Sequence, residues 1–171
     1  YNGMNRPNLY SCEVPLGPSD LPTVTYTNDP VQARAMTKRD IANLRRWHRN
    51  AALRAKSAGF DIDLCLCRTR FRRTATFPRA RLLVELIEDT KDAVGDTCAV
   101  TCRIGVEELL GEEGIHREEM LELFSEISEL PDLWDLTLCS WDIDSQTSRF
   151  SEEGHEEPFV TGFKQLTTKP V

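Results

Sequence analysis

The sequence lacks both a long apolar run and an excess of basic residues. No stretch approaches the roughly 20 apolar residues that a membrane span needs, and no charged-then-apolar signal opens the chain. Lys and Arg number 21 against 28 Asp and Glu, which leaves a net charge of -7. A protein that binds nucleic-acid phosphates usually has a basic face. We therefore expect no membrane and no nucleic-acid partner.

The sequence also lacks the spacings that bind zinc. It contains no C-x-x-C pair, and its histidines His48, His116 and His155 are scattered. Five of the cysteines lie within or beside strand-like runs, where a thiol behaves as a small buried apolar group. The six cysteines are Cys12, Cys65, Cys67, Cys98, Cys102 and Cys139. We expect no metal, reduced thiols and a cytoplasmic location.

The first 36 residues show no pattern of a long helix or a central strand. Five of the nine prolines lie there, and proline removes a backbone donor and restricts φ. We expect 1–36 to be an irregular covering segment and 37–171 to hold repeated helix–strand units. Together they would form a single partial barrel domain, 1–171.

From residue 37 the sequence alternates amphipathic helices with apolar strands. The predicted helices are 37–59, 78–94, 116–130 and 157–166. The predicted strands are 60–67, 98–104 and 133–139, with another starting near 169. Thr37 and Asp40 resemble a capping box, and Gly59 supplies a stop for the first helix. That helix is rich in arginine, which we interpret as a solvated outer face rather than a binding face.

The strands begin about 35–40 residues apart, which is the spacing of βα units in a parallel sheet. They read as continuous apolar runs, as strands buried on both faces do. No G-x-G-x-x-G turn follows any of them, which disfavours a dinucleotide-binding Rossmann sheet. The sequence therefore predicts an α/β fold of the (β/α)8 TIM-barrel type that is incomplete, with about four βα units.

Functional side chains gather where two of these strands end. Arg103 stands near the end of strand 98–104, and Trp141, Asp142 and Asp144 follow strand 133–139. In a barrel all strand carboxyl ends open on one face, so these residues would converge there. An arginine is costly to bury unpaired, and its guanidinium suits a phosphate or the anionic edge of a reduced cofactor ring.

Two other interpretations of this region remain open. The acidic loop after strand 133–139 could be a solvated connection. Asp142 and Asp144 could instead act as a carboxylate pair in a different barrel enzyme, although no second strand end supplies another acid.

Taken together, the motifs resemble the flavin-dependent amine dehydrogenases (trimethylamine, dimethylamine and histamine dehydrogenase), a branch of the Old Yellow Enzyme-like NADH:flavin oxidoreductases. The resemblance spans nearly the whole chain. The segments that carry it are Asn2-Gly3-Met4 with Pro7-Asn8, Pro15-Leu16-Gly17-Pro18-Ser19, Ala55 to Ile62, Arg79 to Leu83, Cys102-Arg103-Ile104, Leu133-Trp134-Asp135, Ser148-Arg149-Phe150 with Gly154-His155, and Lys169-Pro170-Val171.

The resemblance implies an FMN-dependent barrel that oxidises a small amine. Arg103 falls on the family's flavin-contacting, cofactor-binding arginine. Trp141 falls on an aromatic wall of the substrate pocket, where an alkylammonium is held by cation–π attraction. Asp144 falls on the catalytic acid that supports a histidine.

The chain departs from the family at two catalytic positions. Leu66 and Thr69 stand where the family has a tyrosine and a histidine, and neither side chain performs acid–base work. The N-x-R-x-D-E-Y-G-G-S loop is replaced by the basic stretch Arg68–Pro78. The flavin-attachment cysteine, the phosphate-binding strands and the iron–sulfur cysteines have no counterpart in this sequence.

These departures lead to two expectations. The chain begins at Tyr1 and ends where a strand starts, so we expect a truncated, poorly active or inactive portion of an amine oxidoreductase. The alternative is a non-catalytic half-barrel that serves in binding or assembly, or a degenerate fragment. Its exposed sheet edges would favour a homo-oligomer.

Overall fold

The computed structural model describes residues 13–17, 20, 22–23, 31–67, 76–109, 114–138 and 153–171. The chain divides into two compact units, Tyr1–Trp47 and His48–Val171. No helix in the described part of the chain combines the length and the apolar character that crossing a membrane requires.

The described part of the first unit contains four strands of two residues each. β1 (Leu16–Gly17) pairs in parallel with β4 (Arg34–Ala35), and β2 (Pro22–Thr23) pairs antiparallel with β3 (Val31–Gln32). Such short pairings fit a segment rich in proline, which cannot donate to a sheet ladder.

Helix α1 (Lys38–Ser57) lies within the predicted range 37–59 and is shorter than it by one residue at the start and two at the end. The Asp40 N–H donates to Thr37 Oγ1 at 3.2 Å, and the Thr37 N–H donates to Asp40 Oδ2 at 2.9 Å, which completes the capping box. Arg34, and then Thr37, hold the pKa of Asp40 well below its usual range. Gly59 follows the helix with a φ of 84°, the left-handed conformation that glycine adopts most easily.

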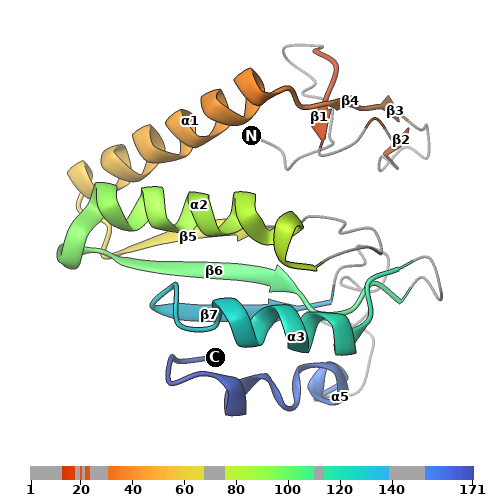
Figure 1. Ribbon diagram of the computed structural model, residues 1–171. Helices are drawn as coiled ribbons and strands as arrows, with labels where there is room; N and C mark the ends of the chain where they lie inside the picture. The colour runs from red at the N-terminus through yellow and green to blue at the C-terminus, as the bar shows by residue number, and fades with distance from the viewer. Residues whose placement is uncertain are drawn as a thin grey trace. The chain divides into compact units, whose positions relative to one another are not determined.

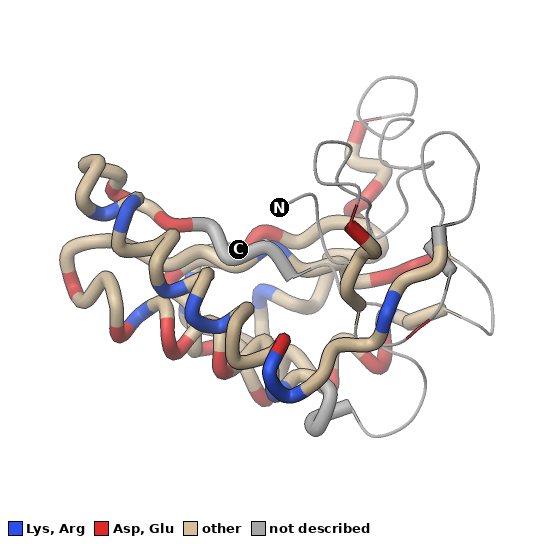
Figure 2. The backbone as a smooth tube through the Cα atoms, turned by 90° about the horizontal axis from the view of Figure 1, so that it is seen from above, with Lys and Arg blue, Asp and Glu red and all other residues tan. Residues whose placement is uncertain are grey.

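Lys and Arg are spaced along α1 (Figure 2). Leu44 and Ala52 form its buried side, while most of its basic residues are exposed. The exposed basic residues are Lys38, Arg39, Arg46, Arg49, Arg54 and Lys56. This arrangement agrees with a solvated outer face.

The second unit is built on a parallel sheet of three strands in the order β5–β6–β7 (Figure 1). They are β5 (Ile62–Cys67), β6 (Ala99–Gly105) and β7 (Leu133–Thr137). The predicted parallel α/β arrangement is therefore confirmed.

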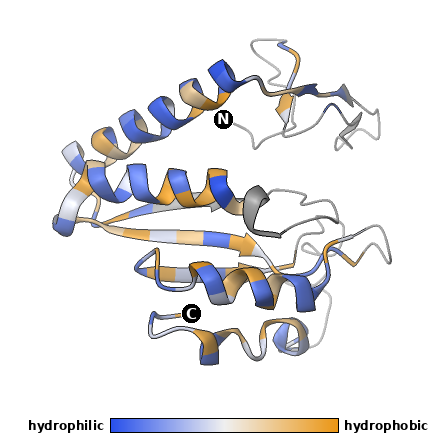
Figure 3. Cartoon of the chain, viewed as in Figure 1, coloured by the Kyte–Doolittle hydropathy of each residue, from blue (hydrophilic) through white to orange (hydrophobic). Residues whose placement is uncertain are grey.

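Helices α2 (Thr76–Val94) and α3 (Arg117–Ile127) cover one face of this sheet, and a 3-10 turn, η1 (Gly95–Thr97), leads from α2 into β6. Along the strands apolar colour is interrupted by polar colour, and the two alternate along the helices (Figure 3). Alternate residues of β6 meet different surroundings, because successive side chains of a strand point to opposite faces of the sheet. Its buried, helix-facing residues are Val100, Cys102 and Ile104.

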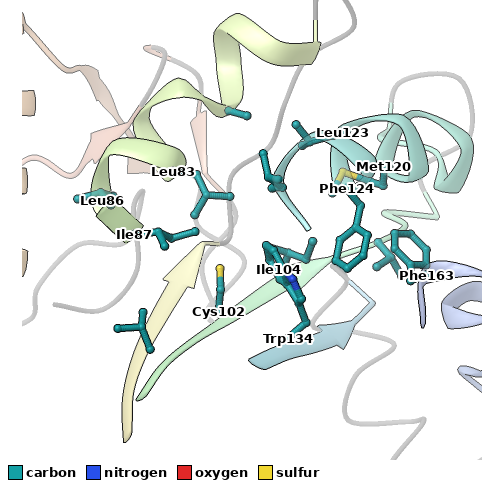
Figure 4. Close-up of a cluster of buried hydrophobic side chains, with 14 of the residues drawn as sticks. Leu83, Leu86, Ile87, Cys102, Ile104, Met120, Leu123, Phe124, Trp134 and Phe163 are labelled. Carbon is teal, nitrogen blue, oxygen red and sulfur yellow. The ribbon is translucent and has the colours of Figure 1, made fainter. Parts of the chain in front are cut away.

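Three aromatic rings occupy the centre of the core (Figure 4). The Phe124 ring lies 4.9 Å from that of Trp134 and 5.2 Å from that of Phe163, measured between centroids. The indole Nε1 of Trp134 donates to the Ser128 carbonyl at 2.7 Å, so the buried indole is satisfied.

Helix α3 is shorter than predicted. The helix ends at Ile127 rather than near residue 130. The Ser128 carbonyl accepts from Trp134 and from Thr167 Oγ1, two side chains outside the helix.

The prediction of one continuous helix over 157–166 is wrong. The structure has a short α5 (Glu157–Val160) and a 3-10 turn, η3 (Phe163–Leu166). Gly162, between them, has a φ of 102°, which no right-handed helix accommodates. The Arg117 guanidinium also donates to the carbonyls of Phe159 and Thr161. Tertiary contacts therefore override the helical pattern.

The last residues of the chain lie along the outer edge of β7. The Trp134 N–H donates to the Pro170 carbonyl at 3.0 Å, although residues 169–171 are not part of a strand. This contact resembles the first hydrogen bond of a further parallel pairing.

The amino ends of the strands are held by Asp132. Its carboxylate accepts from the Val100 N–H at 2.9 Å and pairs with the Lys91 ammonium at 2.9 Å. Burial by itself would raise the pKa of Asp132, but the hydrogen bond and the ammonium outweigh burial and lower it.

We expect Asp132→Asn to lower stability at neutral pH and to have less effect in acid. Because the folded-state pKa is depressed, the stabilisation is present above the unfolded value of roughly 4 and is lost as the pH falls through the folded value. Urea unfolding of both proteins at pH 7 and pH 3 measures this difference. Asp92→Asn, at an exposed helix position, serves as the control. A deficit that does not change with pH would refute the prediction.

We expect Phe124→Ala to lower the free energy of unfolding by roughly 3–5 kcal/mol, because it removes the ring that joins Trp134 to Phe163. Phe60→Ala is the matched control, since Phe60 is 63% exposed. Its effect should stay within about 0.5 kcal/mol. Equal losses in the two variants, measured by denaturant unfolding, would show that the aromatic cluster is not the centre of the core.

Candidate functional site

The carboxyl ends of the three parallel strands meet at one edge of the sheet, where α/β proteins place their sites. The register sets three residues in one row across this edge. Leu66 of β5 is the partner of Arg103 in β6, and Arg103 is the partner of Asp135 in β7. The row therefore joins a predicted site residue to Leu66, one of the two positions that depart from the family pattern.

Arg103 lies on the sheet face opposite the one that α2 and α3 cover. Its position in an apolar strand suggested a buried side chain, but the side chain is 50% exposed. Nε lies 2.6 Å and Nη2 lies 2.5 Å from the same oxygen, Oδ2 of Asp135. The guanidinium is thus paired along one side. Nη1 takes no part in this ion pair.

A buried hydroxyl without a partner lies two residues before Arg103 on the same face. Thr101 is 7% exposed, and its Oγ1 is the one buried side-chain polar atom in the described residues that has no hydrogen-bond partner. Burying a hydroxyl without a hydrogen bond is unfavourable. The half-exposed guanidinium of Arg103, by contrast, suits a ligand edge that carries oxygen acceptors or negative charge.

The loop after β6 is held by two buried glutamates. Glu107 accepts from the N–H groups of Leu109 at 3.0 Å and Arg117 at 2.9 Å, and Glu108 accepts from the Ile115 N–H at 3.1 Å. The acidic residues of this loop therefore have a structural role. These bonds fix the chain just beyond the carboxyl end of β6.

The remaining predicted site residues, Trp141 and Asp144, lie outside the described residues, as do Thr69 and Asp142. Their convergence with Arg103 therefore stays a prediction. Sequence reasoning missed Thr101 and the role of Asp135. The signal that could have identified Asp135 is an acid within an apolar strand beside a strand that carries an arginine.

In the described ranges, no three His, Cys, Asp or Glu side chains gather as metal ligands. His48 is half-buried in α1. Burial lowers its pKa, while the nearby Asp63 acts in the opposite direction, so the imidazole is neutral at pH 7.

No family model matches the sequence. The chain is 28% identical over 204 aligned positions to dimethylamine dehydrogenase of Hyphomicrobium sp. (strain x), covering 100% of the chain and 26% of that protein. The alignment is longer than the 171 residues of the chain. Parts of the relative therefore align with gaps in this sequence.

Two solved structures are more similar. Histamine dehydrogenase from Rhizobium sp. 4-9 is 46% identical with a TM-score of 0.88, covering 100% of the chain and 27% of that protein. The 6-hydroxypseudooxynicotine amine oxidase from Pseudomonas geniculata N1 is 38% identical with a TM-score of 0.81, covering 99% and 28%. The chain thus spans about a quarter of the length of these relatives. The matching folds are TIM barrels of the Old Yellow Enzyme type, as predicted.

We expect Thr101→Val to raise the free energy of unfolding by about 1 kcal/mol, because it replaces an unpaired hydroxyl with a methyl group of the same shape. Thr90→Val is the matched control. Thr90 is also buried, but its Oγ1 donates to the Leu86 carbonyl at 2.7 Å, so this variant should lose about 1 kcal/mol. Urea unfolding compares the two. Destabilisation by Thr101→Val would show that the hydroxyl already has a partner.

Proposed function

Because the whole chain is homologous to one segment of the histamine and dimethylamine dehydrogenases, we propose that it forms part of an FMN-dependent oxidoreductase barrel that oxidises a small amine. The observation that carries this proposal is the position of Arg103. Its guanidinium lies at the carboxyl end of β6, on the sheet face that would line the interior of a complete barrel.

The residues on this face fit a flavin. An isoalloxazine ring has an edge of carbonyl and ring-nitrogen acceptors that becomes anionic on reduction. Arg103 is the side chain that would hold this edge, because its side chain is 50% exposed on this face. When bound, FMN would supply the electron acceptor for amine oxidation.

Two further roles come from the resemblance alone. Trp141 would form an aromatic wall that holds the substrate ammonium by cation–π attraction. Asp144 would be the acid that orients a catalytic histidine.

We propose that this chain by itself turns over poorly or not at all. Leu66 stands at the position of the family's tyrosine, as the immediate register partner of Arg103, and Thr69 stands at that of its histidine. General acid–base groups typically contribute 10²–10⁴-fold to rate, so their loss removes several orders of magnitude.

A second candidate is a non-catalytic half-barrel that assembles with another copy of itself. Exposed apolar residues on the sheet face opposite α2 and α3 favour this alternative: Ile62 is 55% exposed and Leu133 is 37% exposed. The outer strand β5 could extend the sheet with a second chain. A monomer in sedimentation experiments that also unfolds cooperatively would exclude this candidate.

We further propose a cytoplasmic protein without membrane or nucleic-acid partners. Cys98 and Cys102 are buried thiols, as a reducing compartment permits. The net charge of -7 disfavours binding to a phosphate backbone.

The proposal is tested by titrating the chain with FMN and then adding histamine or dimethylamine without oxygen. We expect weak flavin binding that Arg103→Ala abolishes, and no bleaching of the flavin absorbance by amine. Arg81→Ala, at a helix residue whose side chain is 79% exposed, should change neither. Tight stoichiometric binding with bleaching by amine would overturn the assignment of an inactive chain. Flavin binding that does not depend on Arg103 would overturn the site.

A further inference from the structure

The Arg103 guanidinium is held by one carboxylate oxygen from the neighbouring strand. Both Nε and Nη2 lie within hydrogen-bonding distance of Asp135 Oδ2. The two residues are register partners in β6 and β7, so both side chains rise from the same sheet face. The contact therefore fixes one side of the guanidinium and leaves Nη1 outside the pair.

We propose that Asp135 is a positioning residue that sets the orientation of Arg103 for a ligand on the sheet face opposite α2 and α3. This inference rests on the proposed function, in which Arg103 holds the acceptor edge of FMN. A planar guanidinium has five N–H donors in a fixed fork, so occupying its Nε side determines where the other donors point.

The pair differs from an ordinary surface ion pair in where its residues stand. Arg81 and Glu85 pair at 2.7 Å within a single helix, where the arginine side chain is 79% exposed. Arg103 and Asp135 stand on two adjacent strands that are 32 residues apart in sequence. Each of the two side chains is therefore held by its own strand of a packed sheet, which is a rigid support for a group that must meet a ligand.

The pair also differs from the acid at the opposite end of the same strands. Asp132 accepts a backbone N–H of β6 as well as the Lys91 ammonium, so it ties the sheet together. In the part of the chain that the structure describes, Arg103 is the one hydrogen-bond and ion-pair partner of the Asp135 side chain. Asp135 therefore binds the side chain of Arg103, whereas Asp132 also binds the backbone.

A carboxylate in this position has two separable effects. It orients the guanidinium through hydrogen bonds, and it offsets part of its positive charge. Asp135→Asn retains an oxygen acceptor and removes the charge, whereas Asp135→Ala removes both. If orientation is the role, the asparagine variant should preserve ligand binding and the alanine variant should not.

The experiment measures FMN affinity by quenching of flavin fluorescence in the full chain. We expect Asp135→Ala to weaken binding by roughly tenfold, the scale seen when a group that orients a ligand-binding side chain is removed. Asp135→Asn should stay within about threefold of the parent, a difference well under one tenfold step of affinity. The control is Glu85→Gln in the exposed helical pair. Equal affinities for all variants, or tighter binding by Asp135→Ala, would overturn the inference.

A second readout does not depend on flavin. The Nε–H resonance of Arg103, identified by its disappearance in Arg103→Lys, should exchange slowly with water in the parent and in Asp135→Asn, and rapidly in Asp135→Ala. An unchanged Arg103 resonance in Asp135→Ala overturns the positioning role. If the resonance responds as expected but no variant or parent binds FMN, the pairing stands and the proposed cofactor fails.

Discussion

The structure depends on burying one face of a three-stranded parallel sheet beneath two helices. Phe124 joins the strand residue Trp134 to the later Phe163, and this contact brings α3, β7 and the C-terminal segment into one core. Because strand side chains alternate between faces, covering one face determines which residues the other face presents. The positions of Thr101, Arg103 and Asp135 all follow from this constraint.

Both ends of the sheet carry an ion pair, but the two pairs differ in what else they contact. At the amino ends, Lys91 and Asp132 combine with a backbone hydrogen bond to Val100, and the chain is tied together there. Nearer the carboxyl ends, the pair of Arg103 and Asp135 stands on the sheet face opposite α2 and α3. The pair at the amino ends therefore ties the strands together, whereas the other pair lies toward the end at which parallel α/β proteins bind their ligands.

Local sequence signals predicted most of the elements because their causes are local. The capping box of Thr37 and Asp40 lies within one helical turn, and Gly59 needs only its own backbone conformation to end α1. The continuous helix predicted over 157–166 failed for a non-local reason. Arg117, more than 40 residues away, binds carbonyl groups there, and Gly162 turns the chain.

The sequence by itself determined the parallel α/β class, because that depends on periodicity and spacing, and its motifs indicated Arg103 as a candidate site residue. Only the tertiary structure decided that Arg103 is half-exposed and paired with Asp135, and that Thr101 is buried without a partner. Both facts arise from register between strands distant in sequence. One residue of slip would move each of these side chains to the opposite face.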